Sequence, residues 1–235
     1  MYKLETHLHV AGTSPCAMTD EKTIARIYKD KGYNGIVYTS HFNSYMPVYF
    51  GLTEKEYNGN FVAHYLNLKE ECAKFGIDVF FGMEYMPDCV SYFNDKSPDK
   101  AEFHIYGAST DFVESGEAFS ALTLSVKDVS ELCKRNGWIF SQAHPFRAMI
   151  NYRHPELIEA AEAYNGCPRC DSRNADAEKY VADNGLIPMA GSDFHEPQDG
   201  GAGVMLENEV KTEKELVEEL RKRRHTLITG NHPCV

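Results

Sequence analysis

The sequence predicts an α/β fold, with a barrel favoured over an open, doubly wound sheet. Short apolar segments alternate with helical patterns along the chain, as in proteins with a mostly parallel sheet. Seven such segments are each followed by a polar motif, which favours the barrel. The 235 residues suffice for one barrel-sized domain with a real core, and no repeat or linker divides them. We therefore expect a single domain over residues 1–235.

Seven main strands are expected because each is a short run rich in apolar residues, as buried strands are. They cover residues 2–7, 35–39, 78–82, 103–107, 138–142, 158–164 and 187–191, and a short eighth strand is expected at 226–229.

Helices are expected between most of these strands, at 19–31, 61–75, 125–136, 172–184 and 212–223. Thr19, Ser125 and Thr212 are the expected N-caps, and glycines follow several of the helix ends. The aromatic stretch 42–60 is expected to be a long loop beside His41. Such a loop either covers a small ligand or fills the core.

The formal net charge of −11 disfavours a protein that binds long nucleic acids. It does not exclude a small phosphorylated substrate, because bound cations can reverse the local field in a pocket. No apolar run approaches the roughly 20 residues of a membrane span. The N-terminus lacks an apolar signal region, so the expected location is the cytoplasm.

The seven cysteines are expected to be reduced thiols, because the count is odd and no secretion signal is present. Cys72 and Cys133 fall within helical patterns and are expected in the core. Cys167 and Cys170 form a lone CxxC, for which free loop thiols are favoured over a redox or metal role.

Side chains that bind metal ions gather at the strand ends. They are His7, His9, His41, Glu84, His144, Asp193 and His195, and His104 joins them at the start of the fourth strand. Carboxyl ends of parallel strands converge on one face, so residues distant in sequence meet there. Within His7–x–His9, alternation with period two puts both rings on one side. His64, His154, His225 and His232 are interpreted as ordinary surface or core residues.

Imidazole and carboxylate donors together suit Zn, Mn or Fe rather than a calcium site. Eight donors exceed the four that one tetrahedral ion needs. We therefore expect two or three divalent cations, with Glu84 free to bridge two of them.

The ordered motifs resemble those of the PHP (polymerase and histidinol phosphatase) family of hydrolases over nearly the whole chain. The motifs are H-x-H at 7–9, T-S-H at 39–41, G-x-E ending at Glu84, His104, A-H-P around His144 and G-S-D-F-H at 191–195. The resemblance implies a distorted seven-stranded (β/α) TIM-like barrel with a trinuclear metal site at the carboxyl ends of the strands.

The resemblance also implies how the donors are shared among the three ions. One ion would be held by His7, His9, Glu84 and Asp193, a second by Glu84, His104 and His144, and a third by His41 and His195. The chain departs from the family at two points. Cys16 lies in the stretch where the family usually supplies an Asp or His for the third metal, and Ser40 replaces the usual Asp of T-D-H. Cys16 is either a substitute ligand or a buried loop residue.

The expected chemistry is phosphoester hydrolysis by a metal-activated hydroxide that attacks phosphorus. Glu84, Asp193 and His195 are the expected catalytic residues, with Asp193 or His195 as candidate acids for the leaving group. Arg147, Arg169 and Arg173 follow the fifth and sixth strands and are candidates for phosphate binding. Asn165, before a glycine, is interpreted as a turn residue.

The leading hypothesis is a phosphatase for a small phosphomonoester, of the histidinol-phosphatase type that serves histidine biosynthesis. A second hypothesis keeps the site but changes the substrate to a nucleotide or oligonucleotide phosphodiester, or to phosphotyrosine. A third, of another class, is a non-catalytic metal-binding regulatory domain.

Overall fold

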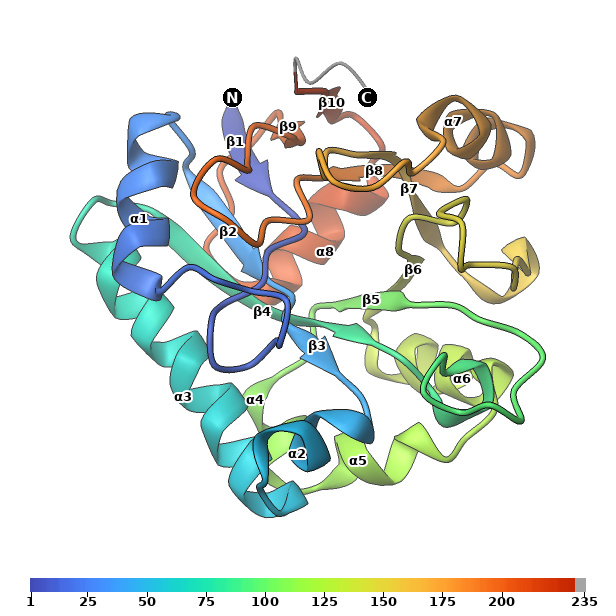
Figure 1. Ribbon diagram of the computed structural model, residues 1–235. Helices are drawn as coiled ribbons and strands as arrows, with labels where there is room; N and C mark the ends of the chain where they lie inside the picture. Colours follow the sequence, from blue (N-terminus) through green and yellow to red (C-terminus); the bar gives the residue numbers. More distant parts are fainter. Residues whose placement is uncertain (231–235) are drawn as a thin grey trace.

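The computed structural model describes residues 1–230 and is a mixed α/β structure around a nearly closed, barrel-shaped sheet (Figure 1). The strands are β1 (Tyr2–Glu5), β2 (Gly35–Tyr38), β3 (His41–Phe42), β4 (Asp78–Tyr85), β5 (Phe103–Tyr106), β6 (Ile139–Gln142), β7 (Ala160–Asn165), β8 (Ile187–Gly191), β9 (Gly203–Leu206) and β10 (Thr226–Ile228). The predicted α/β barrel class is confirmed.

The helices are α1 (Glu21–Asp30), α2 (Tyr45–Phe50), α3 (Glu54–Ala73), α4 (Thr110–Glu114), α5 (Glu117–Leu122), α6 (Val126–Asn136), α7 (Asn174–Asp183) and α8 (Glu213–Arg221), with short 3-10 turns η1 (Asp88–Val90) and η2 (Pro155–Leu157). Within residues 1–230, none of these helices combines the length and the apolar character that a membrane crossing requires.

The sheet order is β10-β9-β1-β2-β4-β5-β6-β7-β8, and β3 pairs with β4 beside this path. The expectation of a parallel sheet holds for β1-β2-β4 and for β6-β7-β8. It was wrong for β5, which runs antiparallel to both neighbours. A strand buried on both faces has the same composition in either direction, so the sequence carried no signal of the reversal. No strand was expected at the position of β9, which runs antiparallel to β1.

The segments that follow β1 and β8 meet at one end of the barrel. Leu8 and Phe194 form a parallel bridge, with Phe194 N 3.1 Å from His7 O and His9 N 3.0 Å from Phe194 O. This bridge extends parallel pairing from β1 to the segment after β8, so the residues following both strands meet across it.

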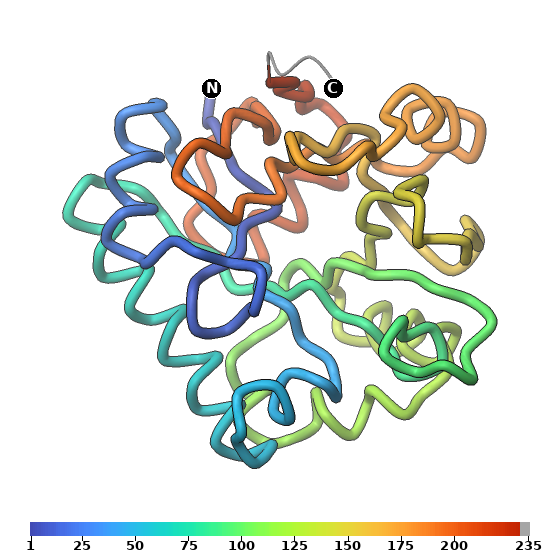
Figure 2. The backbone as a smooth tube through the Cα atoms, viewed as in Figure 1, coloured from blue at the N-terminus to red at the C-terminus, as the bar shows by residue number. Residues whose placement is uncertain are grey.

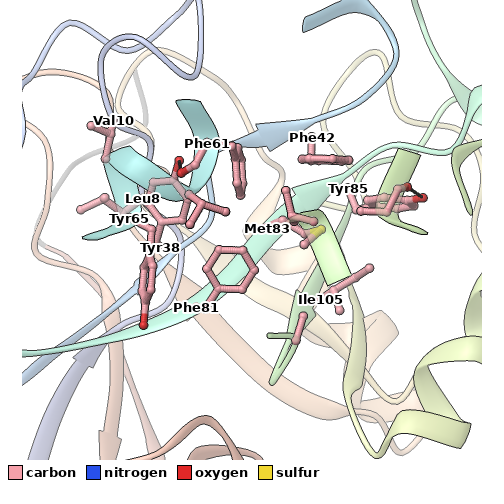
Figure 3. Close-up of a cluster of buried hydrophobic side chains, with 14 of the residues drawn as sticks. Leu8, Val10, Tyr38, Phe42, Phe61, Tyr65, Phe81, Met83, Tyr85 and Ile105 are labelled. Carbon is pink, nitrogen blue, oxygen red and sulfur yellow. Dashed lines mark hydrogen bonds between the residues drawn. The ribbon is translucent and has the colours of Figure 1, made fainter. Parts of the chain in front are cut away.

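The main hydrophobic core lies between the sheet and the helices on its outer side, and it is rich in aromatic rings. Figure 3 shows Phe81, Met83 and Tyr85, which alternate along β4, packed with Phe42 and Phe61. The alternate residues Phe80, Gly82 and Glu84 of β4 face the opposite side, and Phe80 belongs to a second cluster. The strand thus separates an apolar outer face from an inner face that is polar near its end.

The second cluster occupies the region where several strands begin. Ile139, Ala160 and Ile187 are the first residues of β6, β7 and β8, and they pack in one cluster with Leu216 and Leu220 of α8. Figure 2 shows the C-terminal segment that carries α8 returning to the β1 side of the molecule. Burial of this cluster leaves the opposite end of the barrel for polar groups.

The aromatic stretch 42–60 is not a loop, because it contains α2 and the start of α3. Thr53 and Glu56 form a reciprocal capping box that begins α3 seven residues before the expected position. Phe42 and Tyr57 fill the core, whereas Tyr45 and Tyr49 are exposed.

Helix caps differ from expectation at α1 and agree at α6 and α8. Asp20, not Thr19, caps α1, since its carboxylate accepts from Thr23 N at 2.8 Å. Ser125 and Thr212 cap α6 and α8 as expected.

Cys72 and Cys133 are buried in helices, as predicted. The six cysteines of residues 1–230 are free thiols, and Cys234 and His232 lie outside the described residues.

Candidate metal centre

Strand register places three of the expected ligands side by side at one end of the barrel. His41 on β3 is the register partner of Glu84 on β4, and Glu84 is the register partner of His104 on β5. Because β5 is antiparallel, its first residues lie beside the last residues of β4. This explains why a histidine at the start of a strand joins ligands that stand at strand ends.

The segments after β1 and β8 add four more donors. His7 and His9 flank one partner of the parallel bridge between these segments, and Asp193 and His195 flank the other. The apolar residue between the members of each pair lies in the main core, so both polar pairs face the opposite side.

Five side chains form the centre of the cluster, and all five are buried. His7 Nε2 lies 3.4 Å from Glu84 Oε1 and 3.3 Å from Asp193 Oδ1. His9 Nε2 lies 3.3 Å from Glu84 Oε2 and 3.3 Å from Asp193 Oδ1. His144 Nε2 lies 3.0 Å from Glu84 Oε1. The two oxygens of Glu84 thus face different histidines, as a bridging carboxylate requires.

The donor atoms form four overlapping sets, and within each set the atoms lie within 4.8 Å of one another. They are His7, Glu84 and His104; His7, His144 and Asp193; His41, Glu84 and Glu102; and His9, Cys16, His41 and His195. All eight ligands expected from the sequence occur in these sets. The structure therefore brings the eight residues together at one end of the barrel.

The environment of the cluster keeps the Glu84 and Asp193 carboxylates ionised but acts in opposite directions on the histidines: the pKa of His104 is lowered, whereas Asp193 and Glu162 outweigh burial and raise the pKa of His7 well above its usual value. Burial and the charge of His7 lower the pKa of His104 to about 3, which leaves its ring neutral. Burial alone would raise the pKa of Glu84 and of Asp193, but His7 and the other cations beside them hold both pKa values well below the usual range. Neutral imidazole and ionised carboxylate are the forms that coordinate a cation.

Two buried atoms of the cluster indicate that divalent cations fit there. His104 Nε2 is buried and makes no hydrogen bond within the described residues, and Glu84 Oε2, also buried, makes no well-aligned one, although His41 Nδ1 lies 2.8 Å away. A buried polar atom without a partner costs about 1–3 kcal/mol. A cation would satisfy both atoms, so the donor set fits divalent metal ions.

Two of the expected ligands occupy strained backbone conformations. His144 has φ 25° and Asp193 has φ 50°, in the left-handed region that favours glycine. Such residues cost on the order of 1–3 kcal/mol each and persist where the surroundings fix them. Here the amide of His144 donates to Glu162 Oε2 at 2.7 Å, and the carboxylate of Asp193 meets Arg147 Nη2 at 2.5 Å.

Two carboxylates of the site, Glu162 and Glu102, were not predicted from the sequence. Glu162 Oε1 lies 2.8 Å from His7 Nδ1, which directs the other ring nitrogen of His7 into the cluster. Glu102 lies 3.5 Å from His41 Nδ1 and 3.6 Å from His144 Nε2, and it accepts from Tyr92 at 2.7 Å. The signals were Glu162, one of two glutamates in the predicted strand 158–164, and Glu102–x–His104, which repeats the alternation of the H-x-H motif.

A cavity of about 250 Å³ opens onto the cluster. Its lining includes Cys16, His41, Glu84, Tyr92, Glu102, His144, Arg147, Cys167, Arg169, Cys170, Asp193 and His195. The cavity is thus a shared space between the metal-binding side chains and the residues that follow β6, β7 and β8.

The three arginines differ in their relation to this cavity. Arg147 and Arg169 line it, whereas Arg173 does not. Arg169 is held by two hydrogen bonds of 2.7 Å to Asp199. Arg173 is about half exposed and pairs with Asp176. Arg147 is thus the arginine most directly joined to the cluster.

Asn165, interpreted from the sequence as a turn residue, also joins the hydrogen-bond network of the site. It is the last residue of β7 and is buried. Its Oδ1 accepts from Arg147 Nη2 at 3.0 Å, and its Nδ2 donates to Glu162 Oε2 at 3.0 Å and to Asp193 Oδ2 at 3.3 Å. It therefore links the arginine to both carboxylates.

Three of the histidines interpreted as ordinary residues, His64, His154 and His225, lie within the described residues and outside the cluster. His64 pairs with Glu21 at 2.5 Å, and His154 pairs with Glu156 at 2.8 Å. His225 Nε2 lies 2.8 Å from the carbonyl of Pro188.

Comparison with known proteins finds similarity to PHP proteins in part of the sequence and in the fold. A family model described as PHP-associated matches residues 171–225. No curated protein sequence matches the chain. The resemblance to PHP proteins expected from the motifs is confirmed by this match and by the fold of solved structures.

Three solved structures share the fold. A two-domain protein containing a predicted PHP-like metal-dependent phosphoesterase, from Bacteroides vulgatus ATCC 8482, has a TM-score of 0.66 and 16% identity over 97% of this chain and 65% of that one. A candidate metal-dependent phosphoesterase from Bifidobacterium adolescentis ATCC 15703 has a TM-score of 0.58 and 12% identity over 94% and 96%. An amidohydrolase from Chromobacterium violaceum, with bound sulfate and no metal, has a TM-score of 0.57 and 13% identity over 97% and 98%. The chain thus spans about two thirds of the two-domain protein.

Proposed function

We propose that this protein, which shares the fold of PHP proteins, is a metal-dependent phosphoesterase that hydrolyses a small phosphomonoester. The observation that carries the proposal is the convergence of eight expected ligands around Glu84, beside a cavity lined by Arg147. Two of the structural relatives bear names of metal-dependent phosphoesterases, and a third binds sulfate, an anion shaped like phosphate.

Divalent cations held by these residues would supply a hydroxide at neutral pH and neutralise the charge of the phosphate. The protein's own residues position the reactants. Glu162 fixes the orientation of the His7 ring through the hydrogen bond to Nδ1. Arg147 lines the cavity, and we assign its guanidinium group to a phosphate oxygen.

The leaving oxygen needs a proton, and a residue at the edge of the cluster is the candidate to donate it. His195 lines the cavity, and its Nδ1 lies 2.7 Å from the carbonyl oxygen of Asp193. That contact holds the ring so that Nε2 faces the cavity side. His195 is the favoured acid in the form of the site whose third position holds no cation, because a ring bound to a cation through Nε2 has no proton to give; Asp193, held by Arg147, is the less favoured acid.

The size and charge of the site favour a small substrate. The cavity of about 250 Å³ suits one phosphorylated metabolite, and the net charge of −11 opposes a long polyanion. Histidinol phosphate, and hence a place in histidine biosynthesis in the cytoplasm, is the specific form of the proposal. Nucleotide phosphodiesters and phosphotyrosine are the alternatives on the same site.

The test is a chelation and add-back assay. Metal-free protein would be reconstituted with Zn²⁺, Mn²⁺ or Fe²⁺ and assayed against phosphomonoesters including histidinol phosphate, phosphodiesters, phosphotyrosine and a simple amide. We expect metal-dependent phosphate release from a monoester, lost in His7→Ala and kept in His154→Ala, a histidine outside the cluster.

Other outcomes would redirect or overturn the proposal. Amide cleavage without phosphate release would move the protein to the chemistry of its amidohydrolase relative. Tight metal binding without turnover of any substrate would instead support a non-catalytic metal-binding domain.

A further inference from the structure

The loop that carries Cys16 is fixed to the metal cluster at both of its ends. Before the cysteine, Ser14 Oγ lies 3.1 Å from His9 Nδ1 and accepts from His41 N at 3.0 Å. After the cysteine, Met18 N donates to the carbonyl of His195 at 2.9 Å. The loop is thus attached to the same three histidines that stand nearest to the thiol.

The thiol sulfur shares a space with ring nitrogens from three separate segments. Donor atoms of His9, Cys16, His41 and His195 all lie within 4.8 Å of one another. Cys16 Sγ is 3.0 Å from His195 Nε2, and the other nitrogen of that ring already contacts the Asp193 carbonyl. Sulfur and nitrogen donors on one zinc ion stand about 3.5 Å apart, given bond lengths near 2.3 Å and 2.0 Å. The group is compact enough for a single ion.

One of the three histidines, His9, has both ring nitrogens directed at groups other than Cys16. His9 Nε2 faces Glu84 and Asp193 at 3.3 Å each, while its Nδ1 is engaged by Ser14. Removing it leaves Cys16, His41 and His195 as the protein donors. Three protein ligands with a fourth position open is the arrangement of catalytic rather than structural metal sites.

We infer that Cys16 is the thiolate ligand of a third cation that is also held by His41 and His195 beside the cavity. Soft sulfur favours Zn²⁺ or Fe²⁺ over Mn²⁺ or Mg²⁺. The inference deepens the proposed function, since it concerns the same metal centre, and it makes the third position selective for a thiophilic ion. It also explains how the chain dispenses with an Asp or His in residues 10–18.

Two further thiols line the same cavity, and the experiment must distinguish them from Cys16. Cys167 and Cys170 both belong to the cavity lining. They are absent from the donor sets found among the described residues, in contrast to Cys16. Cys89 is exposed elsewhere and serves as a neutral control.

The test uses the full chain under reducing conditions. Protein loaded with Co²⁺ would be examined for the thiolate-to-cobalt charge-transfer band in the near ultraviolet, and zinc-loaded protein for a sulfur scatterer about 2.3 Å from zinc by X-ray absorption. We expect both signals in the wild type, in Cys89→Ser and in the double variant C167S/C170S. Both signals should be lost in Cys16→Ser.

A conservative variant separates ligation from folding. Cys16→Asp should keep the number of bound ions, lose both sulfur signals, and shift the preference of the third ion from Zn²⁺ towards Mn²⁺. Sulfur signals that persist in Cys16→Ser, or that disappear in C167S/C170S, would overturn the inference. So would their absence from the wild type.

The same samples would be assayed with the phosphoester panel, so that the two proposals fail separately. Loss of the sulfur signals in Cys16→Ser, together with no turnover by any sample, would uphold the thiolate ligand and reject the phosphoesterase. Phosphatase activity with no sulfur signal in the wild type would support the phosphoesterase and reject the thiolate ligand.

Discussion

Glu162 shows how one residue behind the cluster organises several in front of it. Its two oxygens serve His7 Nδ1, the His144 amide and the Asn165 side chain, and the residue is buried. Burial alone would raise the pKa of Glu162, but the neighbouring His7 outweighs it and lowers that pKa to about 2. The carboxylate therefore stays charged and fixes the ring that faces Glu84.

Glu162→Gln should weaken metal binding about 10- to 100-fold, as loss of a partner behind a ligating histidine does. Titration of the metal-free protein against a metal-buffered indicator would measure the change. Glu159→Gln is the matched control, because this carboxylate pairs with Arg221 away from the site. Equal affinity in wild type and Glu162→Gln would contradict the assigned role.

Arg147→Lys tests whether the planar, forked guanidinium matters beyond its charge. Lysine keeps the charge but cannot make two parallel hydrogen bonds to a phosphate. We expect KM for a phosphomonoester to rise by roughly tenfold with the metal content unchanged. The matched control is Arg173→Lys, because Arg173 does not line the cavity. This variant should keep the wild-type KM. An unchanged KM in Arg147→Lys would remove Arg147 from the substrate site.

At the scale of elements, the site depends on close approach between β8 and the segment after β1. Gly191 ends β8, and a Cβ atom there would collide with His7 Cβ and come within 3.0 Å of His7 N and 3.1 Å of Glu162 Oε1. Glycine is thus needed because backbone and ligand side chains converge at this point, independently of any turn.

Gly191→Ala should destabilise the protein by about 1–3 kcal/mol, the usual cost of overpacking. Gly59→Ala is the matched control: Gly59 lies within α3, and a Cβ there would meet no atom within 4 Å. The control should stabilise the helix by about 0.5–1 kcal/mol. Urea unfolding of both variants measures the two effects, and a loss of stability in Gly59→Ala alone would contradict the packing argument.

At the scale of the whole molecule, the barrel concentrates charged groups that bind cations in a protein of net charge −11. Glu84, Glu162 and Asp193 are all buried within the same cluster. Burying several carboxylates together is costly unless positive charge accompanies them. Bound cations are therefore expected to contribute to the stability of the fold as well as to chemistry.

Chelation should lower the melting temperature. An ion at about 100 times its Kd stabilises the folded state by about 2.7 kcal/mol for each site. Calorimetry with and without chelator measures the shift, and chelator saturated with the same metal beforehand is the control. A melting temperature that does not respond to metal removal would contradict tight binding in the barrel.

The sequence by itself determined the chemical identity of the donors and much of the fold class. Alternation along a strand is a local property, so His7 with His9 and Asp193 with His195 could be assigned to one side of the chain. The convergence of strand ends then followed from the α/β architecture. The eight expected ligands came from these two rules together with the motif resemblance.

Only the tertiary structure decided which segments meet. The reversal of β5 brings His104 and Glu102 to the end of β4, the loop bearing Cys16 lies against His195, and Glu162 reaches behind His7 from β7. Strand direction, register and loop placement depend on packing between residues that are far apart in sequence. No local pattern records them, because a buried apolar strand has the same composition whichever way it runs.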